Sequence, residues 1–366
     1  MLSSVRSRRP HMPAVTFDRY CEMLDKALRE GFAYPAINVL EIATLNAAIE
    51  GFTAAKSDGI VQIGVAAGTH TSGAAKDAVL GAITLAEHAR RLAEKYDINV
   101  AVHTDHCPTE KIETFLKPLI LETARRRAAG QPNLFNSHMY DGSGLPLKEN
   151  MRHALPLLEM CRDNEIILEV EAGVVGGEED LSDPSDSSDK SDRSDRSGQS
   201  HSRLYTTPDD MLFVHETLSR VKGARFMLAA TFGNVHGVYK PGHVMLKPSI
   251  LRDGQEAVVK KYGEESRFRL VFHGGSGTTV EEIHESIKYG VVKMNIHTDT
   301  QYAFTRAVAD HMLKNYDGVL RIDGEVGVKQ AYLASTWLDR GRAAMAERVV
   351  RACEDLGSAG KTLGRH

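Results

Sequence analysis

The sequence has 366 residues, of which 42% are hydrophobic and 26% charged, ordinary values for a globular chain with a sizeable core. Lys and Arg number 45 against 49 Asp and Glu, a formal net charge of −4, so no sequence-wide basic face is expected for nucleic acid or an anionic membrane. No apolar run approaches the roughly 18 residues of a membrane-spanning helix. Four scattered cysteines without CxxC spacing predict a reducing, cytoplasmic compartment rather than a disulfide scaffold.

The N-terminal segment, residues 1–12 (MLSSVRSRRPHM), is rich in Arg and Ser and contains no acidic residue. Transit peptides share this bias, but the segment is short and has no apolar face. We therefore expect residues 1–11 to form a disordered extension and a single domain to span residues 12–366.

Eight short apolar runs follow in chain order, each nearly continuous in hydrophobicity and rich in Val, Ile or Phe. This pattern is typical of strands that are covered on both faces. Between them, apolar residues recur at helical spacing. The predicted strands are residues 32–39, 60–65, 98–103, 134–138, 166–171, 226–231, 270–273 and 291–296. The predicted helices include residues 45–55, 82–93, 283–287, 303–313 and 343–356.

The alternation of strands and helices predicts right-handed βαβ units and a parallel sheet, hence the α/β class. Eight units are the number in a (β/α)8 TIM barrel, and the length suits a barrel with insertions. A doubly wound sheet is the alternative.

A low-complexity segment interrupts this series after the fifth strand. In residues 181–200 (LSDPSDSSDKSDRSDRSGQS), 13 of 20 residues are Ser or Asp. Such a composition cannot bury enough surface to offset the entropy of ordering, so residues 181–203 are expected to form a mobile loop. A linker between domains is the alternative, but the strands on both sides belong to one series.

Polar residues gather where the predicted strands end, which is where TIM barrels carry their catalytic groups. A lone histidine there is more often structural, but six on one rim favour a metal site. Imidazole nitrogens suit zinc, and three protein ligands with an open position are typical of a catalytic site. No local motif such as HExxH supports the metal. The polar residues are His103, Asp105, His106, His138, Asp141, Glu169, Glu171, Asn234, His236, His273, Asn295, His297 and Asp299.

Two turns after the seventh and eighth strands are candidates for an anion site. Residues 273–277 read HGGSG, whose glycines let backbone N–H groups approach an anion. Residues 295–300 read NIHTDT and precede a predicted helix, whose positive N-terminus favours anions. Barrels often bind phosphate at this position. Tight turns without a ligand are the alternative.

Longer stretches around these residues resemble the class II, zinc-dependent fructose-bisphosphate aldolase family over residues 12–363. The resemblance implies a lyase with a TIM barrel, zinc and dihydroxyacetone phosphate as one reactant. It also implies a homodimer or homotetramer and a small sugar phosphate as substrate, without nucleic acid or membrane partners. The segments are HTDHCP (103–108), SHMYDGS (137–143), LEVEAGVVGGEED (168–180), LAATFGNVHGVYKPG (228–242), VFHGGSG (271–277), VVKMN (291–295), DTQYAFTR (299–306) and NYDGVLRIDGEVGVK (315–329).

The resemblance assigns the catalytic zinc to His106, His236 and His273. It implies that Asp105 is the acid/base partner of the aldehyde-derived hydroxyl and that Glu179 moves a proton on and off the ketone carbon. Such chemistry needs a Lewis acid to stabilise charge beside the ketone. The carboxylate that removes a carbon-bound proton must be shielded from water, which a closing loop achieves.

Further ion and substrate positions are implied by the resemblance alone. Asp141 and Glu171 match a site for a second or alternative divalent ion, and a monovalent cation, Na+ or K+, is implied near Val235 and Gly237. The implied substrate-binding residues are Asn38, Gly237, Gly274, Gly275, Ser276, Asn295, Ile296, His297 and Thr298.

Three departures from the family's pattern fall where the aldehyde half of the substrate would bind. Ser335 stands where the family has an arginine for the distal phosphate, Gly64 replaces a serine, and His297 replaces an aspartate. Arg340 or Arg342 could substitute for the missing arginine. The departures predict weaker cleavage of fructose 1,6-bisphosphate and better use of an aldehyde without the terminal phosphate, although the bisphosphate remains the first expectation for the substrate.

Two functions of other kinds stay open at this point. A non-catalytic relative would keep the barrel as a binding module, but folding alone does not need Asp105 and three histidines. A metal-dependent hydrolase would use metal-bound water and would leave the two anion-binding turns unexplained. Metal content of the purified protein separates the first from an aldolase.

Overall fold

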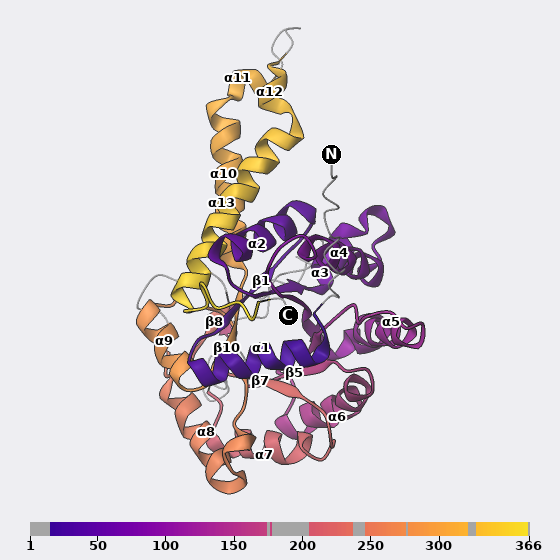
Figure 1. Ribbon diagram of the computed structural model, residues 1–366, viewed down its shortest axis with the longest axis vertical. Helices are drawn as coiled ribbons and strands as arrows, with labels where there is room; N and C mark the ends of the chain where they lie inside the picture. Colours follow the sequence, from indigo (N-terminus) through magenta and orange to yellow (C-terminus); the bar gives the residue numbers. More distant parts are fainter. Residues whose placement is uncertain are drawn as a thin grey trace, which may run out of the picture.

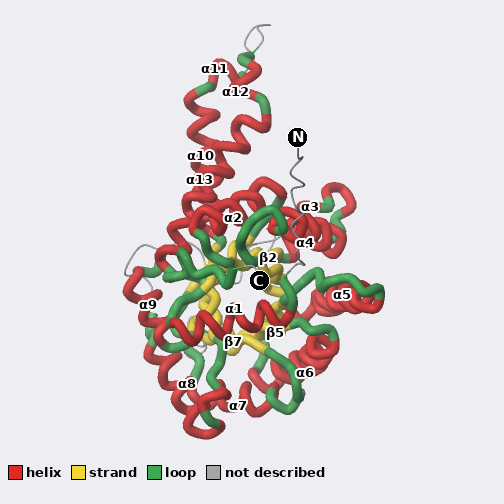
Figure 2. Tube along the Cα trace, viewed as in Figure 1, coloured by secondary structure: helices red, strands yellow, loops and turns green. Residues whose placement is uncertain are grey.

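The structure is a computed structural model that describes residues 15–173, 176–177, 205–236, 246–275, 277–320 and 327–364, with the backbone alone described at 176–177 and 235–236. Eight parallel strands close into a barrel surrounded by helices (Figures 1 and 2), which confirms the predicted (β/α)8 TIM barrel. The doubly wound alternative is wrong, because the first and last strands pair with each other. Around the barrel the strands are β1 (Tyr34–Asn38), β10 (Val291–Ile296), β9 (Leu270–Phe272), β7 (Phe226–Ala230), β5 (Ile167–Ala172), β4 (Ser137–Asp141), β3 (Val100–Pro108) and β2 (Gly59–Ile63).

Each predicted strand overlaps an observed one, with differences at the third and fourth. β3 continues beyond residue 103 to Pro108, so it carries Asp105 and His106 within the strand. Its pairing with β4 shifts between Thr104 and Cys107. A second parallel sheet consists of β6 (Gly176–Gly177) and β8 (Val235–His236). The expected extension 1–11 and loop 181–203 lie outside the described residues.

The helices follow the strands as predicted, with longer bounds. Short turns of other helix types are η1 (Gly73–Ala75), η2 (Thr109–Lys111), the π-helical η3 (Ile112–Leu116) and η6 (Glu264–Ser266). The α-helices are α1 (Phe17–Glu30), α2 (Ile42–Ala55), α3 (Val65–Thr71), α4 (Ala78–Ala93), α5 (Lys117–Ala128), α6 (Leu147–Asp163), α7 (Pro208–Leu218), α8 (Ser249–Tyr262), α9 (Val280–Lys288), α10 (Thr298–Lys314), α11 (Tyr316–Val319), α12 (Lys329–Tyr332) and α13 (Ala334–Asp355).

Helix α1 closes the amino-terminal end of the barrel, and it crosses that opening in Figure 1. The helix is capped by Thr16, whose side chain accepts from the Arg19 N–H, and by Gly31 in the left-handed conformation. The buried residues of α1 pack against residues from the beginnings of the strands, so the amino-terminal end of the barrel interior is an apolar layer. This cluster includes Tyr20, Met23, Leu24, Ala27, Tyr34, Ile60, Ala101, Ile167, Met227 and Val271.

The C-terminal helices form an arm that projects from the barrel (Figure 1). Helices α10 and α13 pack along each other, and α11 and α12 lie near the far end of the arm. α13 begins at Ala334, nine residues before the predicted helix 343–356, and the sequence analysis did not anticipate the arm. Within the described residues, none of the helices combines the length and apolarity needed to span a membrane.

Two glycines let α3 and α4 approach each other closely. A Cβ atom added at Gly81 would lie 1.9 Å from the carbonyl oxygen of Gly68, a backbone atom that cannot move aside. Gly81→Ala should therefore lower the free energy of unfolding by about 1–3 kcal/mol, measured by urea denaturation. Gly64→Ala is the matched control, since its added Cβ meets no atom within 4 Å, and it should change stability by less than about 0.5 kcal/mol. Equal effects of the two substitutions would contradict this account of the helix contact.

Candidate metal centre and catalytic residues

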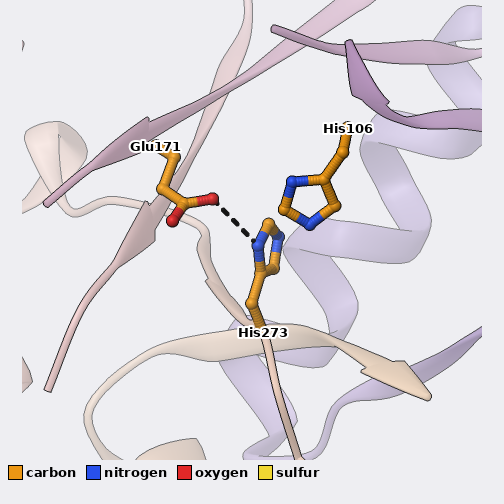
Figure 3. A group of neighbouring side chains, drawn as sticks. All are labelled: His106, Glu171 and His273. Atoms are coloured by element: carbon orange, nitrogen blue, oxygen red, sulfur yellow. Dashed lines mark ion pairs between the residues drawn. The ribbon is translucent and has the colours of Figure 1, made fainter. Parts of the chain in front are cut away.

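Three side chains meet at the carboxyl end of the barrel. His106 comes from β3, Glu171 from β5, and His273 directly follows β9. One ligand atom from each lies within 4.8 Å of the others, and Figure 3 shows the three side chains converging from separate strands. Two imidazoles and a carboxylate are a donor set suited to a divalent transition metal, so the residues present fit a metal site.

His106 is oriented by a carboxylate at the end of the neighbouring strand. Its Nδ1 lies 3.0 Å from Asp141 Oδ2, and the other oxygen of Asp141 accepts from the Ser143 hydroxyl at 2.6 Å and from the Ser143 N–H at 3.0 Å. Because Asp141 contacts Nδ1, the opposite nitrogen, Nε2, turns towards Asp105, whose Oδ1 lies 3.9 Å away. The ring also packs edge-on to that of His273, with centroids 4.9 Å apart.

His273 is fully buried between two glutamates of β5. Its Nε2 lies 2.8 Å from Glu169 Oε1, and its Nδ1 lies 3.2 Å from Glu171 Oε2. Burial lowers the pKa of His273, but the hydrogen bonds to Glu169 and Glu171 outweigh this and raise the pKa overall. Glu169 and Glu171 are separated by one residue of β5, and both side chains therefore enter the barrel.

Asp105 is held by two amides from β1 and β10. Asn38 Nδ2 donates to Asp105 Oδ2 at 2.6 Å, and Asn295 Nδ2 donates to Oδ1 at 3.2 Å. Gln62 in turn donates to Asn38 Oδ1 at 2.8 Å. Burial would raise the pKa of Asp105, but the charges of His106 and Lys293 hold it below the ordinary value. Asp105 is therefore an oriented carboxylate beside the candidate metal centre.

A buried lysine that the sequence analysis missed, Lys293, lies beside these residues. Lys293 Nζ forms an ion pair with Glu169 Oε2 at 2.9 Å, and both side chains are fully buried. His103 Nε2 lies 3.6 Å from the same oxygen. Burial would raise the pKa of Glu169, but the Lys293 ammonium lowers it, so the carboxylate stays ionised. A lysine inside the apolar run VVKMNI was the available signal for this buried charge.

The turn after β9 includes a backbone conformation that favours glycine. Gly274 has φ 67°, which disfavours other residues, and a Cβ at Gly275 would lie 2.0 Å from Met294 Cε. On the neighbouring strand, Asn295 and Ile296 end β10. His297 is then the N-cap residue and Thr298 the first residue of α10.

Several expected site residues fall outside this geometry. Glu179, Gly237 and Ser276 lie outside the described residues. Of His236 only the backbone is described, and it pairs with Gly177 in the small sheet. The backbone of His236 therefore lies beside β6, which ends at Gly177, two residues before Glu179 in the sequence.

The three departures from the family's pattern occupy different places. Gly64 follows β2 and caps α3, and His297 caps α10, so both lie at carboxyl ends of strands. Ser335 instead lies in the first turn of α13 and is exposed on the projecting arm. Arg342 pairs with Glu50 and, at 3.1 Å, with Asp339, so the expectation that it could replace a phosphate-binding arginine is not supported.

The whole chain is similar to known aldolases. Residues 18–361 match the family model described as "Fructose-bisphosphate aldolase class-II". A fructose-bisphosphate aldolase of Streptomyces galbus is 50% identical over 96% of this chain and 100% of its own length, and one of Mycobacterium bovis is 48% identical over 96% and 99%. The crystal structure of fructose-bisphosphate aldolase from Campylobacter jejuni superposes with a TM-score of 0.81 at 34% identity, covering 96% of this chain and 97% of that one. The chain therefore belongs to the class II fructose-bisphosphate aldolases, a family of lyases.

Proposed function

We propose that the chain cleaves fructose 1,6-bisphosphate reversibly into dihydroxyacetone phosphate and glyceraldehyde 3-phosphate, with zinc as its metal. One observation carries the proposal: the carboxylate of Asp105, oriented by two amides, lies beside a largely buried cluster of residues suited to bind a metal, in a chain of this family. The names of relatives at about 50% identity support the same substrate.

His106, His236 and His273 would hold the zinc. The side chains of His106 and His273 lie close together in the structure. His236 ends β8, which pairs with β6 at Gly177. Zinc bound by neutral imidazoles supplies a Lewis acid for the ketone oxygen of the substrate. Glu171 and Asp141, which contact His273 and His106, would serve a second divalent ion, and the backbone near Val235 and Gly237 a monovalent cation.

Asp105 would move the proton of the hydroxyl group that becomes the aldehyde. In the cleavage direction its ionised carboxylate accepts that proton, and in condensation it returns the proton. Asn38 and Asn295 keep both carboxylate oxygens in place, so the group needs no reorientation during the reaction. Glu179 would move the proton on the ketone carbon of dihydroxyacetone phosphate.

The phosphate of the dihydroxyacetone half would lie between the turns after β9 and β10. Backbone N–H groups of the glycine turn and of the positive N-terminus of α10 suit an anion there. The residues proposed to bind this half are Asn38, Gly237, Gly274, Gly275, Ser276, Asn295, Ile296, His297 and Thr298.

A coupled assay with fructose 1,6-bisphosphate tests the proposed function. We expect kcat/KM within the ordinary enzyme range of roughly 10⁴–10⁸ M⁻¹s⁻¹, and loss of activity with a chelator that zinc restores. Because of the departures at Gly64, His297 and Ser335, the assay should include a second substrate. This substrate is an aldol adduct of dihydroxyacetone phosphate whose aldehyde half has no phosphate. Preference for that adduct would show a different acceptor, and full activity in the presence of chelator would overturn the zinc site.

The two described histidines of the metal centre should be needed for metal binding. His106→Ala and His273→Ala should each lower the zinc content well below about one ion per chain and lower kcat about 100-fold or more, because too few ligands remain. Zinc content is measured by atomic absorption. His284→Ala is the control, since His284 is an exposed residue of α9 that contacts the Asp355 carbonyl oxygen, and it should retain both properties.

The two proposed acid/base residues should fail at different steps. Glu179→Ala should slow exchange of the dihydroxyacetone phosphate C–H proton with solvent, because that step needs no aldehyde. Asp105→Ala should leave much of this exchange and block cleavage. Exchange is followed by NMR in deuterated buffer, and equal loss of exchange in both variants would remove the division of roles.

We propose further that the arm joins two copies of the chain in a homodimer, from which a tetramer can form. Seven of the eleven exposed large hydrophobic residues of the described chain lie on it. They are Tyr302, Leu313, Tyr316, Leu320, Val328, Tyr332 and Leu333. A second copy suits this surface because the arm projects away from its own barrel, and a twofold axis would pair each arm with the same surface of the partner.

The free thiols of all four cysteines support a reducing compartment, and we place the activity in the cytoplasm.

Charges placed on the arm should separate the copies. The double variant Leu313→Glu with Val328→Glu should shift the mass measured by light scattering towards that of a monomer, because burying unpaired carboxylates is unfavourable. Leu121→Glu is the control, since Leu121 is similarly exposed but lies on α5, away from the arm. An unchanged mass for the double variant would place the contact elsewhere.

A further inference from the structure

A single buried ammonium group, that of Lys293, lies between two parts of the candidate site, the metal centre at His273 and the carboxylate of Asp105. Lys293 lies in the middle of β10, and its side chain is fully buried inside the barrel. Its Nζ contacts two polar atoms, Glu169 Oε2 at 2.9 Å and Asn295 Oδ1 at 2.7 Å. Each of these contacts leads to a different residue of the site.

The first branch runs through Glu169 to His273. With Oε2 occupied by the ammonium, Oε1 of the same carboxylate accepts from His273 Nε2 at 2.8 Å. Donation from Nε2 selects one tautomer of the imidazole and turns Nδ1 towards Glu171 and the metal centre. A carboxylate on the far nitrogen of a metal-binding histidine fixes the ring and strengthens the ligand.

The second branch runs through Asn295 to Asp105. The amide oxygen of Asn295 accepts from Lys293, so the amide nitrogen must be the group that faces Asp105. That nitrogen donates to Asp105 Oδ1 at 3.2 Å. The ammonium binds the amide oxygen and the Asp105 carboxylate binds the amide nitrogen, so both charges favour the same orientation of Asn295. Lys293 therefore anchors the amide that holds Asp105 Oδ1.

Stability alone does not account for a charged pair at this place. Replacing a buried ion pair with apolar side chains of similar volume often leaves stability unchanged or increases it. The layer below, closed by α1, shows that this barrel can be filled with apolar side chains.

We propose that Lys293 is a positioning residue that fixes the orientation of His273 through Glu169 and of Asp105 through Asn295. This inference rests on the proposed function, in which His273 holds zinc and Asp105 moves a proton. It predicts that losing the Lys293–Glu169 pair weakens metal binding even in a chain that folds.

Zinc affinity, measured by competition with a chromophoric chelator, is the main readout. Lys293→Met should weaken zinc binding by about 10- to 100-fold, the usual effect of removing a residue that supports a metal ligand. Because this variant leaves the Glu169 carboxylate buried without its cation, it should also be less stable. The double variant Lys293→Met with Glu169→Gln removes both charges and should recover stability while zinc binding stays weak. Its cobalt-substituted form should also show a changed visible absorption spectrum.

Asp58→Asn is the matched control for stability. The Asp58 carboxylate is also buried, and it accepts from the N–H groups of Asn99 and Leu363 at the opposite end of the barrel, so its loss should lower stability and leave zinc affinity unchanged. Wild-type zinc affinity in the folded double variant would overturn the proposal, and so would failure of that variant to fold, which would assign the pair to folding. A wild-type chain that neither binds zinc nor cleaves the bisphosphate would instead overturn the proposed function.

Discussion

Closure of the parallel barrel is the constraint on which the site depends. Pairing of β1 with β10 brings the carboxyl ends of all eight strands to one rim, so residues separated by more than a hundred positions become neighbours. His106 and His273 share an edge-on ring contact only because β3 and β9 face each other across that rim. The opposite end is filled by α1 and its apolar cluster. The polar groups inside the barrel are therefore open to solvent or to a ligand only at the carboxyl ends of the strands.

Several of the polar groups buried in the barrel have partners of suitable chemistry. Unpaired charges inside a barrel would be costly, and here Lys293 balances Glu169, Asn38 and Asn295 donate to Asp105, and Asp141 contacts His106. The same hydrogen bonds limit the rotamers of these side chains. Side chains held in place by such contacts suit catalysis in which charge develops on the substrate, because they need little reorganisation.

The C-terminal arm shows a different use of the same fold. Its two long helices bury one face against each other, and the arm leaves Leu313, Val328 and other apolar side chains exposed. The placement of Ser335 on this arm also separates that substitution from the carboxyl-end rim of its own barrel. The substitution therefore cannot be interpreted as a change in a neighbour of Gly64 or His297, which cap helices at that rim.

The sequence by itself determined the eight strands, the (β/α)8 class and the positions of most polar residues, because apolar periodicity and strand-end placement are local properties. It also indicated Asp105, His106 and His273 through motifs with a specific family resemblance. Tertiary structure alone decided that Glu171 joins those two histidines, that β3 extends to Pro108, and that the helix expected at 343–356 begins at Ala334 in an arm. It also gave Lys293 its two partners, since an ammonium in an apolar run becomes meaningful only when barrel closure places a carboxylate from β5 2.9 Å away. Contacts between distant strands depend on register and closure, and no local pattern encodes either.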